Sequence, residues 1–198
     1  MYDMLTSQFN DAMSREGKTI TSSTGKPYKC LFRKNSDKNQ THDRVTIYYW
    51  ATEDIAQGQT LKYNNNYYIV LNQETVENDV YKKSDLLQVN TQIYIISNGY
   101  EIYIKCYAED FTSVNPVGNS QISVVGGNIS FMASDNADTR RLKINNTFTA
   151  LGATWKIVNV YYKSGLCYIY VERIENSSTT LTYTLTVTGS NDCIMEES

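Results

Sequence analysis

The chain has 198 residues, of which 41% are hydrophobic and 20% are charged, and it contains only two prolines. This balance is typical of a globular protein and excludes a disordered or fibrous chain. The formal net charge is −3, and the sequence lacks the basic stripe with which duplex-binding proteins displace counterions from phosphates. Seventeen tyrosines favour half-buried strand surfaces, whereas the single histidine, His42, supplies little for proton transfer near neutral pH.

The chain begins with a pattern of helical period. Over residues 2–16, Leu5, Phe9 and Met13 recur every four residues on one face, and Gly17 is a suitable C-terminal stop. This pattern predicts one amphipathic helix. Two interpretations of its apolar face remain open: the helix caps the open side of a sheet or barrel, or it docks on a partner subunit.

From Lys18 onward the apolar pattern changes to period two, which predicts strands. Asn98-Gly99 is the strongest hairpin signal, and Asn64–Asn66 predicts a tight polar turn. Residues 74–81 are expected to form a loop or a helical turn. Residues 35–43 contain no apolar side chain and predict an exposed loop. Strands are predicted in this first half over residues 18–22, 28–33, 44–50, 60–63, 67–71, 85–97 and 100–107.

The alternating pattern is interrupted after Ala108, where Pro116 and Gly118 favour an extended, bending connection. We therefore expect a first domain over residues 1–110, a linker over 111–120, a second β domain over 121–190 and a flexible tail over 191–198. Strands are predicted in this second half over residues 121–125, 128–132, 141–144, 148–151, 154–162, 166–173 and 181–188.

Short stretches of the two halves read alike. Residues 68–72 (YIVLN) correspond to 155–159 (WKIVN), and residues 81–86 (YKKSDL) correspond to 162–166 (YKSGL). The spacing between these stretches differs between the halves. Two explanations therefore remain open: an internal duplication, or a sequence pattern that β proteins share in general.

The cysteines are far apart, with no Cys-x-x-Cys pair, and one histidine cannot complete a common zinc set. Neither a metal nor a cofactor is expected. Cys30, Cys106 and Cys167 lie in apolar runs and are predicted to be reduced core thiols, because the N-terminus has no secretory signal pattern; Cys193 is predicted to be exposed. No apolar run approaches the length of a membrane-spanning helix, so no membrane contact is expected.

Catalytic motifs are not evident, and we expect that the protein is not an enzyme. There is no Gly-x-Ser-x-Gly elbow and no phosphate-binding Gly-rich loop. A hydrolase with an acidic pair such as Glu109-Asp110 is disfavoured, because adjacent strand residues point to opposite faces. A carbohydrate- or cell-surface-binding β module of adhesin or tail-fibre type, which would use exposed tyrosines, is the alternative to a structural role.

The order of elements in the first half resembles the head–tail connector proteins (head-closure, stopper and adaptor types) of tailed phages that infect Gram-positive bacteria. The resemblance covers residues 1–107 and rests on the segments 1–13, 28–33, 46–49, 55–64 and 67–70. The closing Thr-rich segment 181–188 is similar to an immunoglobulin-like or second barrel module that is added to virion proteins.

The resemblance implies a mainly β protein in which an N-terminal helix and a small β-barrel precede a second β-barrel or β-sandwich. It implies a structural virion protein in a homo-oligomeric ring, six- or twelve-fold, that joins the portal and adaptor proteins to the tail. DNA would pass through this ring without sequence recognition, and the protein would reside in the virion and, during assembly, in the host cytoplasm. Our hypothesis for the residues that contact neighbouring subunits is Leu5, Phe9, Met13, Asn35, Asp37, Asn39 and His42.

Overall fold

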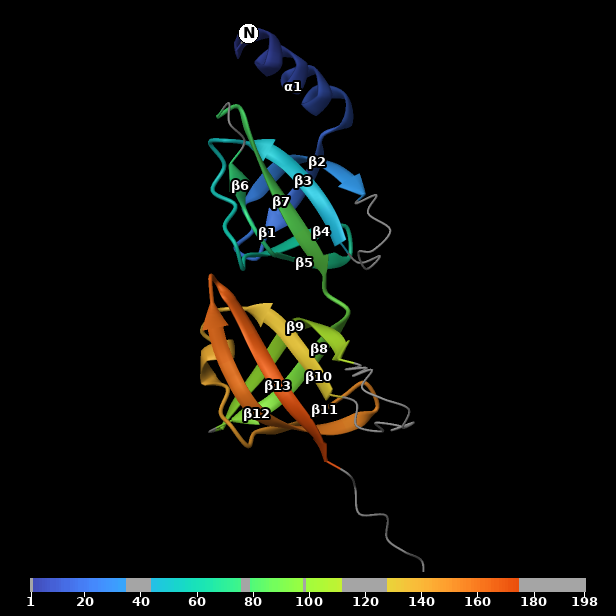
Figure 1. Cartoon of the computed structure of the whole chain (residues 1–198), viewed down its shortest axis with the longest axis vertical. Coiled ribbons are helices and arrows are strands. Elements are labelled where there is room, and N and C mark those ends of the chain that lie inside the picture. The colour runs from blue at the N-terminus through green and yellow to red at the C-terminus, as the bar shows by residue number, and fades with distance from the viewer. Residues whose placement is uncertain (1, 35–43, 76–78, 98, 112–127, 175–198) are drawn as a thin grey trace, which may run out of the picture.

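The computed structural model describes residues 2–34, 44–75, 79–97, 99–111 and 128–174. In this part of the chain a helix, α1 (Tyr2–Glu16), precedes two small β-barrels that are stacked end to end (Figure 1). We call the end of each barrel that points toward α1 its upper end, and the opposite end its lower end. The predicted fold class, a helix followed by two β modules, is confirmed.

The first barrel is closed by hydrogen bonds. Its strands follow the order β1-β2-β3-β7-β5-β4, and β4 pairs with β1 to complete the ring. The very short β6 pairs with β7 beyond the end of β5. The strands are β1 (Lys18–Ser22), β2 (Pro27–Lys34), β3 (Arg44–Trp50), β4 (Thr60–Tyr63), β5 (Asn66–Val70), β6 (Glu74–Thr75) and β7 (Tyr81–Gln88).

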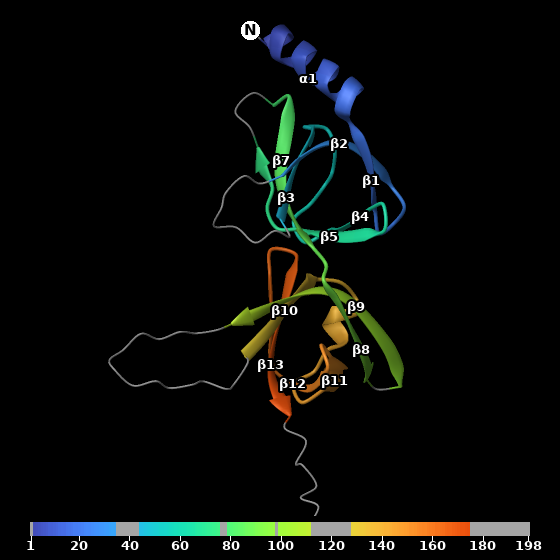
Figure 2. The same ribbon diagram turned by 90° about the vertical axis from the view of Figure 1, so that its right-hand side faces the viewer.

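The second barrel follows the order β8-β9-β10-β13-β12-β11, and β11 lies beside β8. A short 3-10 helix, η1 (Thr139–Arg141), connects β10 to β11. The views in Figures 1 and 2 show the two barrels one above the other, with a single short connection from β7 to β8. The strands are β8 (Thr91–Ser97), β9 (Tyr100–Phe111), β10 (Asn128–Ser134), β11 (Thr147–Ala150), β12 (Ala153–Lys163) and β13 (Leu166–Ile174).

The boundary that we expected between the two β modules is wrong. β8 and all but the last residue of β9 fall within the expected first domain, yet β9 pairs with β10 and β8 pairs with β9 in the second sheet. The change of sheet falls at Val89–Asn90, between β7 and β8, and it divides the segment 85–97, which we had expected to be one strand. The alternating pattern runs through both strands almost without interruption, and only long-range pairing assigns them to different barrels. The expected linker over 111–120 and the tail over 191–198 lie almost wholly outside the described residues.

Most of the predicted elements are confirmed, and two are wrong in addition to the segment 85–97. The amphipathic helix, the hairpin around Asn98-Gly99 and the turn at Asn64–Asn66 are present. Residues 74–75 form the strand β6 where a loop or helical turn was expected. Residues 141–144 were expected to be a strand, but they leave η1 and enter a turn in which Asn146 accepts a hydrogen bond from the Lys143 backbone. The predicted strands 121–125 and 181–188 lie outside the described residues.

The two barrels repeat one topology. Read in chain order, β1, β2, β3, β4, β5 and β7 have the same neighbours in the ring as β8, β9, β10, β11, β12 and β13. All ladders are antiparallel. The ladders also share their register: Cys30 pairs with Tyr49 as Cys106 pairs with Ala133, and each cysteine occupies the second strand of its barrel.

The shared register places core residues of the two barrels at equivalent positions. Leu61 pairs with Tyr68 as Phe148 pairs with Trp155, and Val70 pairs with Leu86 as Ile157 pairs with Val171. All of these side chains are buried in the cores of their barrels. Equivalent buried pairs are Ile20 and Ile93, Cys30 and Cys106, Ile47 and Phe131, Ile55 and Leu142, Leu61 and Phe148, Tyr68 and Trp155, Val70 and Ile157, and Leu86 and Val171.

The irregular segments repeat as well. Gly58 donates its backbone N–H to Val70, and Asn145 donates to Ile157, both at 2.8 Å. Both Gly58 and Asn145 have positive φ. Turns are less constrained than strands, so agreement at this level is not expected of two unrelated β modules. The barrels therefore repeat one topology down to these turns, which favours an internal duplication over a pattern common to β proteins.

Of the two pairs of similar sequence stretches, one occupies equivalent positions in the two barrels and the other does not. Residues 68–72 occupy the same positions of the first barrel as 155–159 occupy in the second. Residues 81–86, however, are equivalent to 166–171 and not to 162–166, because Tyr81 pairs with Trp50 as Leu166 pairs with Ser134. The similarity of the second pair was therefore a coincidence of composition.

Candidate functional site

The apolar face of α1 is buried within the chain. Phe9 and Met13 are only 7% and 2% exposed, and Leu5 packs against the same cluster. The Phe9 ring meets Trp50 edge-on at 4.6 Å between centroids and stacks on Tyr81 at 5.0 Å. The helix thus caps the upper end of the first barrel, as one of our two interpretations expected. Phe9 and Met13 are not available to a neighbouring subunit in this structure, which corrects our hypothesis for them.

The other residues that we expected to contact neighbouring subunits belong to the segment between β2 and β3. This segment lies outside the described residues, so our hypothesis for it stays a prediction. The residues concerned are Asn35, Asp37, Asn39 and His42.

The second barrel covers the lower end of the first barrel, as α1 covers the upper end. The turn of the β12–β13 hairpin contacts the peptide between Gln57 and Gly58 so closely that a Cβ on Gly58 would overlap the carbonyl of Gly165. That carbonyl also accepts a hydrogen bond from the Asp135 backbone at 2.8 Å. The hydroxyl groups of Thr60 and Ser134 are hydrogen-bonded across the junction. Backbone contact and a side-chain hydrogen bond therefore fix the two barrels against each other.

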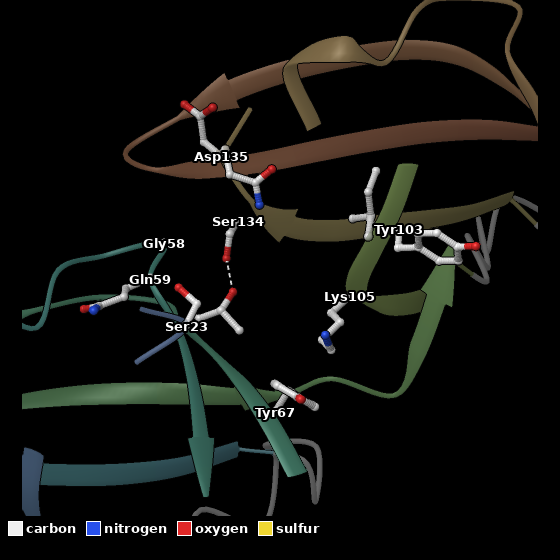
Figure 3. A pocket seen from close by; sticks show the side chains of 11 residues that line it. Ser23, Gly58, Gln59, Tyr67, Tyr103, Lys105, Ser134 and Asp135 are labelled. Carbon is white, nitrogen blue, oxygen red and sulfur yellow. Dashed lines mark hydrogen bonds between the residues drawn. The ribbon is translucent and has the colours of Figure 1, made fainter. Parts of the chain in front are cut away.

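A polar cleft of about 390 Å³ opens beside this junction (Figure 3). The Lys105 ammonium lies 4.2 Å from the centre of the Tyr67 ring and bridges the barrels by a cation–π contact. Asp135 accepts hydrogen bonds from Arg140 at 2.7 and 2.8 Å, and these bonds lower the pKa of its carboxyl. The cleft lining is Ser23, Gly58, Gln59, Thr60, Tyr67, Tyr103, Ile104, Lys105, Ser134, Asp135 and Asn136. Its described charged groups already have partners, and we regard the cleft as the rim of the junction.

Large apolar side chains are exposed almost entirely on the second barrel. Among the described residues, Met4 on α1 is the exception. On the outer face of β12 and β13, Tyr161 stacks on Tyr168 with ring centres 4.7 Å apart. The equivalent positions in the first barrel hold the ion pair of Glu74 and Lys83. The remaining exposed residues are Tyr94, Ile96, Tyr100, Tyr103, Ile144, Leu151, Val158 and Tyr162.

The sequence alone did not find this surface. Tyrosine alternation showed which residues share a face of a strand, but it did not show which face is exposed, and in β12 the adjacent Tyr161 and Tyr162 point to opposite faces. The exposed apolar surface becomes evident only when equivalent positions of the two barrels are compared. That comparison requires the strand register, which the structure supplies.

The described cysteine thiols are all buried. Cys30, Cys106 and Cys167 are buried free thiols, as expected from the sequence, and desolvation raises the pKa of each to about 12. Within the described ranges, no cluster of His, Cys, Asp and Glu side chains could hold a metal ion. In the same part of the chain, no helix is long and apolar enough to cross a membrane.

Residues 1–88 match the family model of the YomX N-terminal domain. The family is phage-associated, of the Bacillus phage SPbeta-like kind. The match ends at Gln88, the last residue of β7, so it covers α1 and the first barrel and stops where the sheets change. No curated protein and no solved structure matches the chain. The match points to a phage protein.

Proposed function

We propose that this protein is a structural component of a phage particle that joins head to tail as part of a homo-oligomeric ring around the DNA channel. The observation that carries the proposal is the match of α1 and the first barrel to a phage-associated family. The ring, its six- or twelve-fold symmetry and its contacts with portal, adaptor and tail proteins are parts of the proposal. So is the absence of catalytic activity.

The stacked architecture supports a structural role. Side-chain and backbone contacts fix one barrel on the other, so a load applied at one end can pass to the other end without a hinge. The exposed apolar side chains of the second barrel are the kind of surface that protein interfaces use.

The charge of the chain also supports a channel protein. The formal net charge is −3, and a basic channel wall would hold the phosphates of passing DNA and slow its exit. DNA would pass through such a ring without recognition of its sequence.

The decisive experiment is to locate the protein in purified particles. Particles are analysed by quantitative mass spectrometry and electron microscopy, with and without the gene. We expect a fixed small copy number per particle in the normal phage, and unjoined heads and tails without the gene. Joined, infectious particles that lack the protein would contradict the proposal.

A finer test concerns the loop between β2 and β3. Deletion of residues 36–40 should leave the purified chain folded but block particle assembly. The control replaces the same residues by a Gly/Ser linker of equal length, which separates loss of the side chains from loss of loop length. Normal infectious particles from both variants would refute the role of the loop.

The alternative, a carbohydrate- or cell-surface-binding module, makes a different prediction. A glycan array and a cell-wall pull-down with the purified chain would then show selective binding that carboxylate or tyrosine substitutions abolish. A ring protein should show no sugar selectivity in either assay.

A further inference from the structure

The lower end of the second barrel exposes two isoleucines. Ile96 is 64% exposed and Ile144 60%, and β8, which carries Ile96, lies beside β11, which begins shortly after Ile144. By the shared register the equivalent residues of the first barrel are polar, Ser23 and Gln57. Ser23 stays exposed although a barrel covers that end, so contact with a barrel does not require an aliphatic side chain there. Because exposed aliphatic surface is unfavourable in water, the two isoleucines favour a closer, apolar contact.

One part of this chain starts at that end. β13 ends at Ile174, which pairs with Thr154 at the lower end of the barrel (Figure 1). Residues 175–198 continue from there and lie outside the described residues. At the equivalent point of the first barrel, Val89 donates its backbone N–H to Tyr67 at 2.8 Å, and the chain then enters the second barrel, which covers that lower end. The chain thus already contains one case in which the part that follows the last strand of a barrel covers its lower end.

The sequence that follows β13 predicts an apolar face. Residues 175–180 contain no apolar side chain and suit a connection. In residues 181–188 threonine alternates with four apolar residues, which fall on one face of an extended chain: Leu181, Tyr183, Leu185 and Val187. Such a face is stabilised by packing on another apolar surface.

The connection is long enough to reach both isoleucines. From β13 the way across the end of the barrel passes β12 and β11 to β8, three strand spacings or about 14 Å. The residues 175–180, when extended, span about 20 Å. A tethered segment also competes well with separate partners, because its effective concentration is on the order of millimolar. Residues 181–188 are therefore within reach of Ile96 and Ile144.

We propose that residues 181–188 of this chain cover the lower end of the second barrel, with their apolar face on Ile96 and Ile144. In this arrangement a terminal segment of the chain closes each outer end of the stack: α1 the upper end of the first barrel, and residues 181–188 the lower end of the second. The threonine face of the segment points to solvent. The stacked tyrosines of β12 and β13 then remain as apolar surface for other proteins.

Photo-crosslinking in the purified full chain tests this contact, and phage particles are not needed because both parts belong to one chain. A photoreactive aliphatic amino acid replaces Ile144 in one variant, the equivalent Gln57 in a second, and Met4 of α1, which is 67% exposed, in a third. We expect position 144 to cross-link to residues 181–188 in a product of monomer mass, position 57 to cross-link to the β12–β13 turn, and position 4 to reach neither.

Two results would overturn the proposal. One is a product of dimer mass from position 144, which would make a second copy of the chain the occupant. The other is the lack of cross-links from position 144 to residues 181–188 while position 57 reacts, which is expected if a different protein covers this end.

Substitutions on the two faces of the segment are the matched perturbation. Leu185→Ser with Val187→Ser should lower the yield of the cross-link from position 144 about tenfold, because the burial of two aliphatic side chains is lost. The control, Thr184→Ser with Thr186→Ser, changes the opposite face and should alter the yield less than about twofold. The cross-link from position 57 in the same backgrounds shows that the barrels stay folded. Equal losses from both pairs of substitutions, or no loss from either, would refute a contact through the apolar face.

Discussion

The two barrels share a fold but differ in what covers them. The first barrel is enclosed: its ring is closed by hydrogen bonds, α1 covers its upper end and the second barrel covers its lower end. Among the described residues, the second barrel is covered at its upper end alone, and its outer surface carries stacked tyrosines where the first barrel has an ion pair. Because strand order and register are the same, these differences cannot be attributed to the fold. Within the described residues, the first barrel is covered at both ends, whereas the second barrel carries nearly all of the exposed large apolar side chains.

The largest expected effect is a loss of stability in the first barrel alone. Phe9→Ala removes the ring that packs on Trp50 and Tyr81, and we expect it to lower the free energy of unfolding of the first barrel by about 3 kcal/mol. Each barrel holds one of the two tryptophans, so urea unfolding can be followed separately in Trp50→Phe and Trp155→Phe backgrounds.

The control for this experiment lies on the same helix. Met4→Ala, at a side chain that is 67% exposed, should change stability by less than about 0.5 kcal/mol. If both tryptophans reported the same loss of unfolding free energy after Phe9→Ala, the barrels would unfold as one unit. Their stabilities could then not be compared separately.

Alkaline pH should weaken the second barrel more than the first. Burial raises the pKa of Cys30 in the first barrel, and of Cys106 and Cys167 in the second, to about 12. A thiol that stays neutral when folded but ionises when unfolded contributes stability that is complete below its ordinary pKa near 9 and is lost as the pH rises toward 12. At pH 10 the loss is on the order of 1 kcal/mol per thiol, so the second barrel, with two such thiols, should lose more stability than the first, with one.

The measurement is urea unfolding at pH 7.5 and pH 10 with the same two tryptophan reporters. Cys106→Ala should reduce the pH dependence of the second barrel and leave that of the first unchanged. A pH dependence that is equal in both barrels, or unaffected by this variant, would contradict the assignment to the thiols.

The junction can be tested with two glycines. Gly58→Ala and Gly152→Ala both force a side chain into positive φ, at about 1–2 kcal/mol each. Only Gly58 faces another barrel, since nothing lies within 4 Å of a Cβ on Gly152. We expect small-angle X-ray scattering to show an altered spacing of the barrels for Gly58→Ala alone. Identical scattering from the two variants would mean that the junction does not fix the barrels.

The smallest expected change is a gain in stability of the second barrel. Leu151→Asn installs the residue of the first barrel at a position of left-handed backbone, and we expect it to stabilise the second barrel by about 0.5–1 kcal/mol. Thermal unfolding of the purified chain measures this. Asn64→Leu is the reciprocal variant and should destabilise the first barrel by a similar amount. Destabilisation by Leu151→Asn would show that Leu151 is held there by contacts within the chain.

Local patterns predicted local structure well. The spacing of Leu5, Phe9 and Met13 located α1, and Asn98-Gly99 located the β8–β9 hairpin, because helical period and turn chemistry depend on neighbours in sequence. The same patterns failed at residues 85–97. Two strands of different barrels have the same alternation there, and Asn90 by itself is too weak a signal to separate them.

The sequence by itself determined the class of this protein: a mainly β chain with one amphipathic helix, buried cysteines and no evident catalytic set. Tertiary structure decided three matters that no local pattern encodes: that β8 and β9 belong to the second barrel, that Phe9 and Met13 are used within the chain, and that the barrels are one topology repeated. The physical reason is that a strand's period fixes which face is apolar, whereas its partners are fixed by closure of a ring over long sequence separations.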